Sequence, residues 1–70
     1  MKPGDLRQFK DGLTGSARTQ SVAGRPVMIL EVGARRGRPS WVSFLVDGRI
    51  ERCWGGDWVE SNSETIDESR

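Results

Sequence analysis

Apolar residues occur in short runs, separated by clusters of glycine, proline and polar residues. The two strongest runs, residues 27–32 and 41–46, are rich in β-branched residues and too short for typical helices, so they predict strands. Shorter runs at residues 6–9, 49–54 and 58–60 predict three further strands. The hydrophobic pattern is therefore typical of a protein built from β-strands.

The segments between these runs predict turns and loops of different lengths. Asp47 and Gly48 separate two predicted strands, and this dipeptide favours a type I′ hairpin because both central residues need a positive φ. Residues 10–24 hold three glycines and few apolar side chains, which predicts a long, mobile loop. Residues 33–39 (GARRGRP) predict a basic, flexible connection.

Five short strands with one long early loop predict an all-β fold, a small, strongly bent five-stranded antiparallel barrel. Closing the sheet would remove the exposed strand edges that invite aggregation. Seventy residues suffice for one small domain, which we place at residues 1–60. Residues 61–70 are polar and acidic and predict a flexible C-terminal tail.

Composition and charge add limits to this picture. Apolar residues make up 34% of the chain, charged residues 30%, and the formal net charge is +1, so no global field attracts nucleic acid or a membrane. Cys53 is the only cysteine, which excludes an intramolecular disulfide and fits a reducing compartment. With no signal peptide and no membrane-spanning run, we expect a cytoplasmic protein, in the host cytoplasm if the gene is viral.

The residues that usually carry catalysis are scarce. The chain has no histidine, so the usual general base and the usual partner of a serine or cysteine nucleophile are both missing. Asp5 and Asp47 are explained by turns, and no glycine-rich segment has the context of a phosphate-binding loop. A metal site lacks histidine and paired cysteine ligands. The sequence predicts a binding protein without cofactor or metal, and not an enzyme.

Three short motifs resemble a known family. Met-Lys-x-Gly-Asp-Leu at residues 1–6, Asp-Gly-Arg-Ile-Glu at 47–51 and Trp-Val-Glu at 58–60 are similar to the small Src-homology-3-like barrels of tailed phages and bacteria. A proline that usually precedes the last strand is replaced by Gly55 and Gly56. Related barrels of the KOW and Tudor kinds bind nucleic acid or peptides, so the resemblance implies a binding function.

An enzymatic exception exists among similar barrels. A plasmid-borne dihydrofolate reductase of this kind forms its active site in a pore between four copies. The pore-lining Gln-Ile-Tyr signature of that family is missing here. An enzymatic function would therefore need an oligomeric pore of another kind.

Our leading functional hypothesis concerns the two longest strands. If their even-numbered apolar residues fill the barrel, the odd-numbered ones remain outside on neighbouring strands: Val27, Ile29, Trp41 and Leu45. A monomer rarely exposes so much contiguous apolar surface, so either the long loop or tail covers it or another protein binds there. The second reading predicts a phage-type accessory protein that binds a protein partner or forms a homo-oligomer.

The alternative hypothesis is nucleic-acid binding. Arg35, Arg36 and Arg38 lie within four residues, and arginine suits phosphate, although a solvated hairpin tip explains them as well. Trp41 or Trp54 could stack a base beside these arginines. Trp41 is expected to be the most exposed, whereas Trp54 could lie in either environment.

Overall fold

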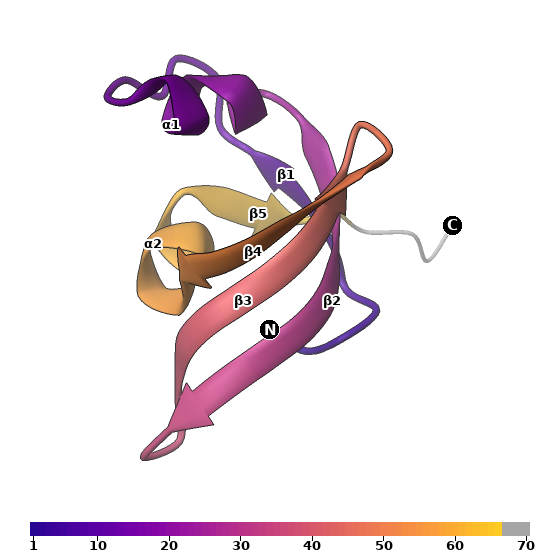
Figure 1. The fold of residues 1–70 in the computed structure, drawn as a ribbon, viewed down its shortest axis with the longest axis vertical. Helices are drawn as coiled ribbons and strands as arrows, with labels where there is room; N and C mark the ends of the chain where they lie inside the picture. Colours follow the sequence, from indigo (N-terminus) through magenta and orange to yellow (C-terminus); the bar gives the residue numbers. More distant parts are fainter. Residues whose placement is uncertain (67–70) are drawn as a thin grey trace.

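The computed structural model describes residues 1–66, with only the backbone of Arg38 and Pro39. It contains one antiparallel sheet with the strand order β4-β3-β2-β1-β5 and two short helices (Figure 1). The elements are β1 (Leu6–Phe9), α1 (Ala17–Val22), β2 (Pro26–Arg35), β3 (Arg38–Val46), β4 (Arg49–Gly55), α2 (Gly56–Ser61) and β5 (Ser63–Thr65). The protein is thus mostly sheet, as the sequence predicted.

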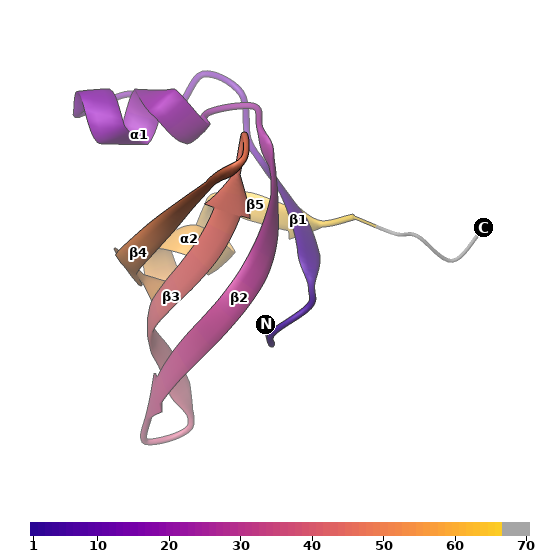
Figure 2. The same cartoon turned by 45° about the vertical axis from the view of Figure 1, so that its right-hand side comes forward.

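Two tight hairpins join the three longest strands. Asp47 and Gly48 have φ values of 50° and 77°, which confirms the predicted two-residue turn between β3 and β4. Arg36 and Gly37 also have positive φ, at 54° and 78°, and form a second such turn between β2 and β3. The basic segment 33–39 is therefore not a flexible connection. It is the end of a β2–β3 arm that projects away from α1 (Figures 1 and 2).

The sheet does not close into a barrel. Among residues 1–66 no strand pairing joins β4 to β5, and helix α2 packs against both of these strands and β3. The prediction of a strand at residues 58–60 is wrong, because this segment is part of helix α2. Three residues are too few to distinguish a period of 2 from a period of 3.6.

The fifth strand lies further along the chain than expected. β5 pairs with β1 through Phe9 and Ser63, so the sheet continues past residue 60, where we expected the tail to begin. Residues 67–70 of that expected tail lie outside the described residues. The segment expected as a long, mobile loop also contains structure, because α1 begins there under a Ser16 cap whose hydroxyl accepts a hydrogen bond from the Thr19 amide.

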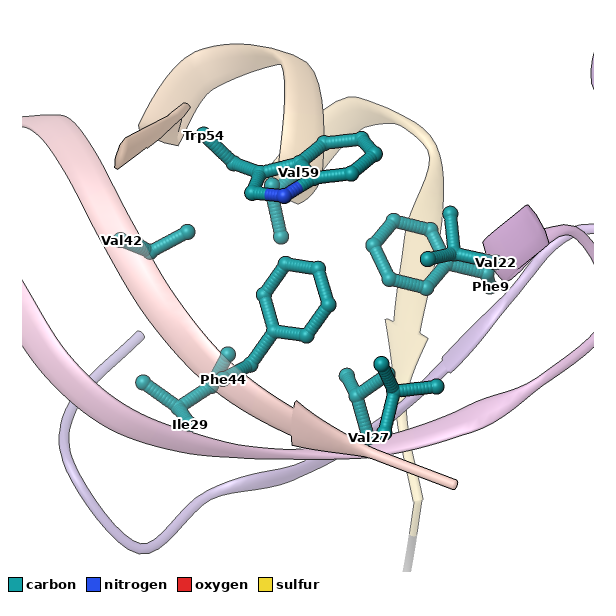
Figure 3. Packing of buried hydrophobic residues seen from close by; sticks show 9 residues of the cluster. Phe9, Val22, Val27, Ile29, Val42, Phe44, Trp54 and Val59 are labelled. Carbon is teal, nitrogen blue, oxygen red and sulfur yellow. The ribbon is translucent and has the colours of Figure 1, made fainter. Parts of the chain in front are cut away.

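The core fills the inner face of the sheet, beneath both helices (Figure 3). Phe44 lies near its centre, with the Phe9 ring 5.5 Å and the Trp54 ring 5.4 Å away between centroids. Val22 from α1 and Val59 from α2 are fully buried against these rings. The other buried apolar residues are Val27, Ile29, Val42 and Val46.

A β-bulge changes which residues of β2 face the core. Val27 and Ile29 are 3% and 0% exposed, so the expectation that they lie outside is wrong. The register shifts between Ile29 and Glu31, after which Val32 faces Val42 on the inner side. Simple alternation fails here because residues of both parities contribute to the core.

Arg7 joins the first strand to the C-terminal end of the fold. It is buried, with its Nε donating to the Ser63 hydroxyl at 2.7 Å and Nη2 donating to the Ser63 carbonyl at 2.9 Å. Further bonds reach the Thr65 hydroxyl and the Glu60 carbonyl. A buried guanidinium needs several acceptors to offset its lost hydration, and residues of β5 together with the end of α2 supply them.

Candidate functional site

The outer face of the β2–β3 arm carries an exposed aromatic ring. Trp41 pairs with Gly33 across the two strands, and the tryptophan is 39% exposed. A Cβ atom built on Gly33 would overlap three consecutive indole atoms of Trp41: Cδ1, Nε1 and Cε2. The indole ring therefore covers Gly33 with one of its faces, since any side chain at position 33 would occupy the space that the ring fills. The expectation that Trp41 is the most exposed tryptophan is confirmed.

Arginines lie at the tip of the same arm. Arg35 and Arg36 are exposed, and Arg35 pairs with Arg38 next to the turn. The backbone thus brings all three predicted arginines together, while the side chain of Arg38 lies outside the described residues. The register shifts between Gly33 and Ala34, but the extra residue, Ser40, is on β3, so alternation along β2 still places Arg35 on the same side as Gly33 and Trp41.

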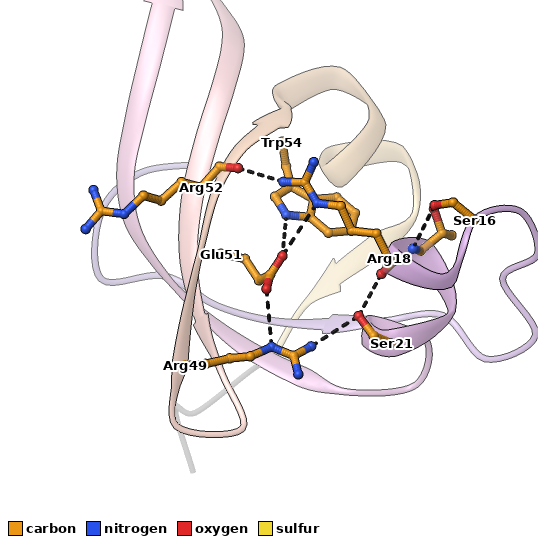
Figure 4. Close-up of polar contacts among 8 residues, drawn as sticks. Ser16, Arg18, Ser21, Arg49, Glu51, Arg52 and Trp54 are labelled. Atoms are coloured by element: carbon orange, nitrogen blue, oxygen red, sulfur yellow. Dashed lines mark hydrogen bonds and ion pairs between the residues drawn. The ribbon is translucent and has the colours of Figure 1, made fainter.

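Arg52 is a further arginine on this face. Its neighbour Glu51 pairs with Phe44 on the inner side, and Figure 4 shows the Arg52 guanidinium pointing away from Glu51. Ser43, two residues from Trp41, lies beside the bulge formed by Arg52 and Cys53. The sequence suggested Arg52 as an addition to the basic loop, but alternation could not assign it to this surface, because the bulge of Arg52 and Cys53 is not visible in the apolar pattern.

Ion pairs neutralise some of the described arginines, but not Arg35, Arg36 or Arg52. Arg18 and Arg49 each lie within 3.5 Å of Glu51, and Arg25 lies 3.3 Å from Asp47. Within residues 1–66, Arg35, Arg36 and Arg52 take part in no ion pair. Exposed Glu31 adds one negative charge on β2. Positive charge therefore predominates around Trp41 and the hairpin tip.

Trp54 does not belong to this surface. It is 6% exposed and lies in the core, its ring centroid 5.3 Å from that of Trp58. The guanidinium of Arg18 covers its ring at 4.3 Å, and its Nε1 donates to Glu51 at 3.1 Å (Figure 4). No base could stack on a ring enclosed in this way, so the proposed contact of Trp54 with nucleic acid is wrong.

The polar network around Glu51 holds α1 against β4. Arg49 lies 3.2 Å from Glu51 and also donates to the Ser21 hydroxyl, while Arg18 donates to the Arg52 carbonyl at 2.6 Å (Figure 4). The bond from Arg18 also occupies a backbone acceptor on the edge strand β4. These contacts are structural, and they protect that edge from pairing with another strand.

Apolar residues do lie on the outer face, but they differ from the predicted set. Met28 pairs with Leu6 and Leu45, and Leu45 pairs with Ile50, which forms one row across four strands. Met28 is 36% and Ile50 is 50% exposed, whereas Leu6 and Leu45 are half-buried. Of the four residues predicted for partner binding, Trp41 and Leu45 lie on this face, and Val27 and Ile29 do not.

Comparison with family models, curated proteins and solved structures finds no match. Within residues 1–66, no group of three histidine, cysteine or acidic side chains is arranged to hold a metal ion. Over the same range, neither helix has the length and apolar character needed to span a bilayer.

Proposed function

We propose that this protein binds nucleic acid through the outer face of its β2–β3 arm. The observation that supports this proposal is the position of the Trp41 ring. The ring lies over Gly33 of the neighbouring strand, and 39% of the residue stays exposed. Large apolar rings are normally buried, and an exposed one on a rigid support suits stacking. Beside it lie Arg35, Arg36 and Arg52, which form no ion pair within the described part of the chain and suit phosphate contacts.

Three arginine contacts would give weak binding that depends on salt and not on sequence. Each phosphate neutralised by an arginine releases counterions, so affinity falls as salt concentration rises. The net charge of +1 means that the attraction comes from the arm and not from the whole molecule. This predicts a local footprint that single arginine substitutions can reduce.

The test is a salt series with mixed-sequence single-stranded and duplex oligonucleotides. The double variant Arg35→Gln/Arg36→Gln should weaken binding and reduce the salt slope by about 0.7 per lost phosphate contact for a single strand. Arg25→Gln is the matched control, because it removes one positive charge from the opposite end of β2, where Arg25 pairs with Asp47. No measurable binding at low ionic strength would refute the proposal.

A second candidate is self-association through the outer apolar row of Leu6, Met28, Leu45 and Ile50. Two identical rows placed face to face would form an isologous contact. A second copy of the chain is therefore the partner that we propose for this surface. Sedimentation velocity over a concentration series measures it. Dimers that Ile50→Lys abolishes would support this candidate, and a monomer at every concentration would exclude it.

We also propose that the fold belongs with the Src-homology-3-like barrels. The support is the set of five short antiparallel strands, the long connection between β1 and β2, and the tight later hairpins. Helix α2 between β4 and β5 takes the position where a closed barrel would bring the two edges together. An experimental structure that places β4 and β5 on unrelated sheets would contradict this assignment.

A further inference from the structure

The outer face of the arm has the elements of a site for one unpaired nucleotide. We propose that single-stranded nucleic acid is the preferred ligand, with a base stacked on Trp41 and its flanking phosphates on Arg35 and Arg52. This inference rests on the nucleic-acid-binding function proposed above.

The register of the strands places the two arginines on opposite sides of the ring. Arg35 is two residues from Gly33 toward the hairpin tip, which corresponds to about 6–7 Å along a strand. Arg52 lies beside Ser43, two residues from Trp41 in the other direction and one strand over. An extended single strand has phosphates on both sides of each base. Arg35 and Arg52 are each about 6–7 Å from the Gly33–Trp41 pair along the strands, so their long side chains reach inward to these phosphates. The order of arginine, tryptophan and arginine thus matches phosphate, base and phosphate.

The ring itself distinguishes a single strand from a duplex. In a duplex each base stacks on its neighbours and exposes only its edges in the grooves. The Trp41 ring covers Gly33 with one face, so the opposite face is the one left for a ligand. A flat surface of this kind contacts the face of a base, which only an unpaired nucleotide offers. Base stacking also tolerates any sequence, because every base has a flat face.

A duplex could contact the arm in a different way. A two-stranded ribbon with basic residues at its tip can enter a major groove. In that mode the phosphates would be held by Arg35 and Arg36, and the face of Trp41 would contribute little. The two modes therefore differ in whether Trp41 matters.

The experiment compares three probes on the full chain: a short oligothymidylate, an oligomer of abasic sites of the same length, and a mixed-sequence duplex. The abasic oligomer keeps the phosphates and removes every base. We expect the oligothymidylate to quench tryptophan fluorescence and to bind about 5- to 150-fold more tightly than the abasic oligomer. Trp41→Leu should reduce its affinity to the abasic level, whereas Trp41→Phe should keep most of the difference.

Arginine variants separate the phosphate contacts from stacking. Arg35→Gln and Arg52→Gln should each weaken both single-stranded probes equally, and each should lower the salt slope by about 0.7. Arg25→Gln should change neither. Circular dichroism of each variant checks that the sheet is intact.

The outcomes distinguish this inference from the function on which it rests. Equal affinity for thymidylate and abasic oligomers, or tighter binding of the duplex, overturns the single-strand inference while nucleic-acid binding stands. No binding of any probe at low salt overturns both.

Discussion

Gly33→Ala tests whether Trp41 occupies the position that the structure gives it. An added Cβ overlaps the indole, so the ring must leave the glycine for the alanine to fit. The residue is 39% exposed, and a buried aromatic side chain covers up to about 250 Å². If the displaced ring loses half of its covered area, about 75 Å² returns to water, which costs about 2 kcal/mol.

The same substitution has a favourable term that does not depend on the ring. Alanine in a strand is more stable than glycine by about 0.5–1 kcal/mol, because the unfolded chain loses conformational freedom. Gly33→Ala should therefore destabilise the natural protein by about 1 kcal/mol but stabilise a Trp41→Ala variant by about 0.5–1 kcal/mol. The sign of the effect reverses, and the coupling between the two positions is about 2 kcal/mol.

Urea unfolding of the four proteins in this double-mutant cycle, followed by circular dichroism, measures the coupling. An effect of Gly33→Ala with the same sign in both backgrounds would show that the ring does not cover the glycine. It would also remove the stacking surface on which the single-strand proposal depends.

Three further predictions concern the stability of the fold. Arg7→Met keeps the volume of the side chain but removes the buried hydrogen bonds to Ser63 and its neighbours. Urea titration should show that the free energy of unfolding falls by about 2–4 kcal/mol. A loss below about 0.5 kcal/mol would contradict this role of Arg7. Cys53 has a φ of 60°, a conformation that glycine adopts more easily than cysteine or valine. Cys53→Gly should therefore raise the unfolding midpoint in urea, and Cys53→Val should lower the free energy of unfolding by about 1 kcal/mol or more. The opposite order would argue against a strained bulge. Arg18→Gln should lower the free energy of unfolding by about 1 kcal/mol, because it removes the contacts of Arg18 with Trp54 and Glu51. This loss should shrink as the salt concentration is raised. A loss that does not change with salt would show that packing alone holds α1.

The turns and the central strands were determined by the sequence itself. Asp47 and Gly48 satisfy the positive φ values of a two-residue hairpin, and this local requirement does not depend on the rest of the fold. The runs at 27–32 and 41–46 are apolar and contain β-branched residues, which favours strands, and both are strands in the structure. The exposure of Trp41 also followed from alternation along β3, because the bulge opposite Ser43 adds its extra residue to β4 and leaves Val42, Phe44 and Val46 on one face.

Only the tertiary structure decided which face of β2 is buried and how the sheet ends. Both faces of β2 are apolar, so the choice depends on packing against Phe44 and on a bulge that the residue pattern does not mark. The last strand consists of polar residues whose pairing is stabilised by Arg7, a partner more than fifty positions away in the sequence. The candidate site combines Trp41 with Arg35 and Arg52 from three strands. Their proximity follows from strand register, a long-range property that local hydrophobic periodicity does not contain.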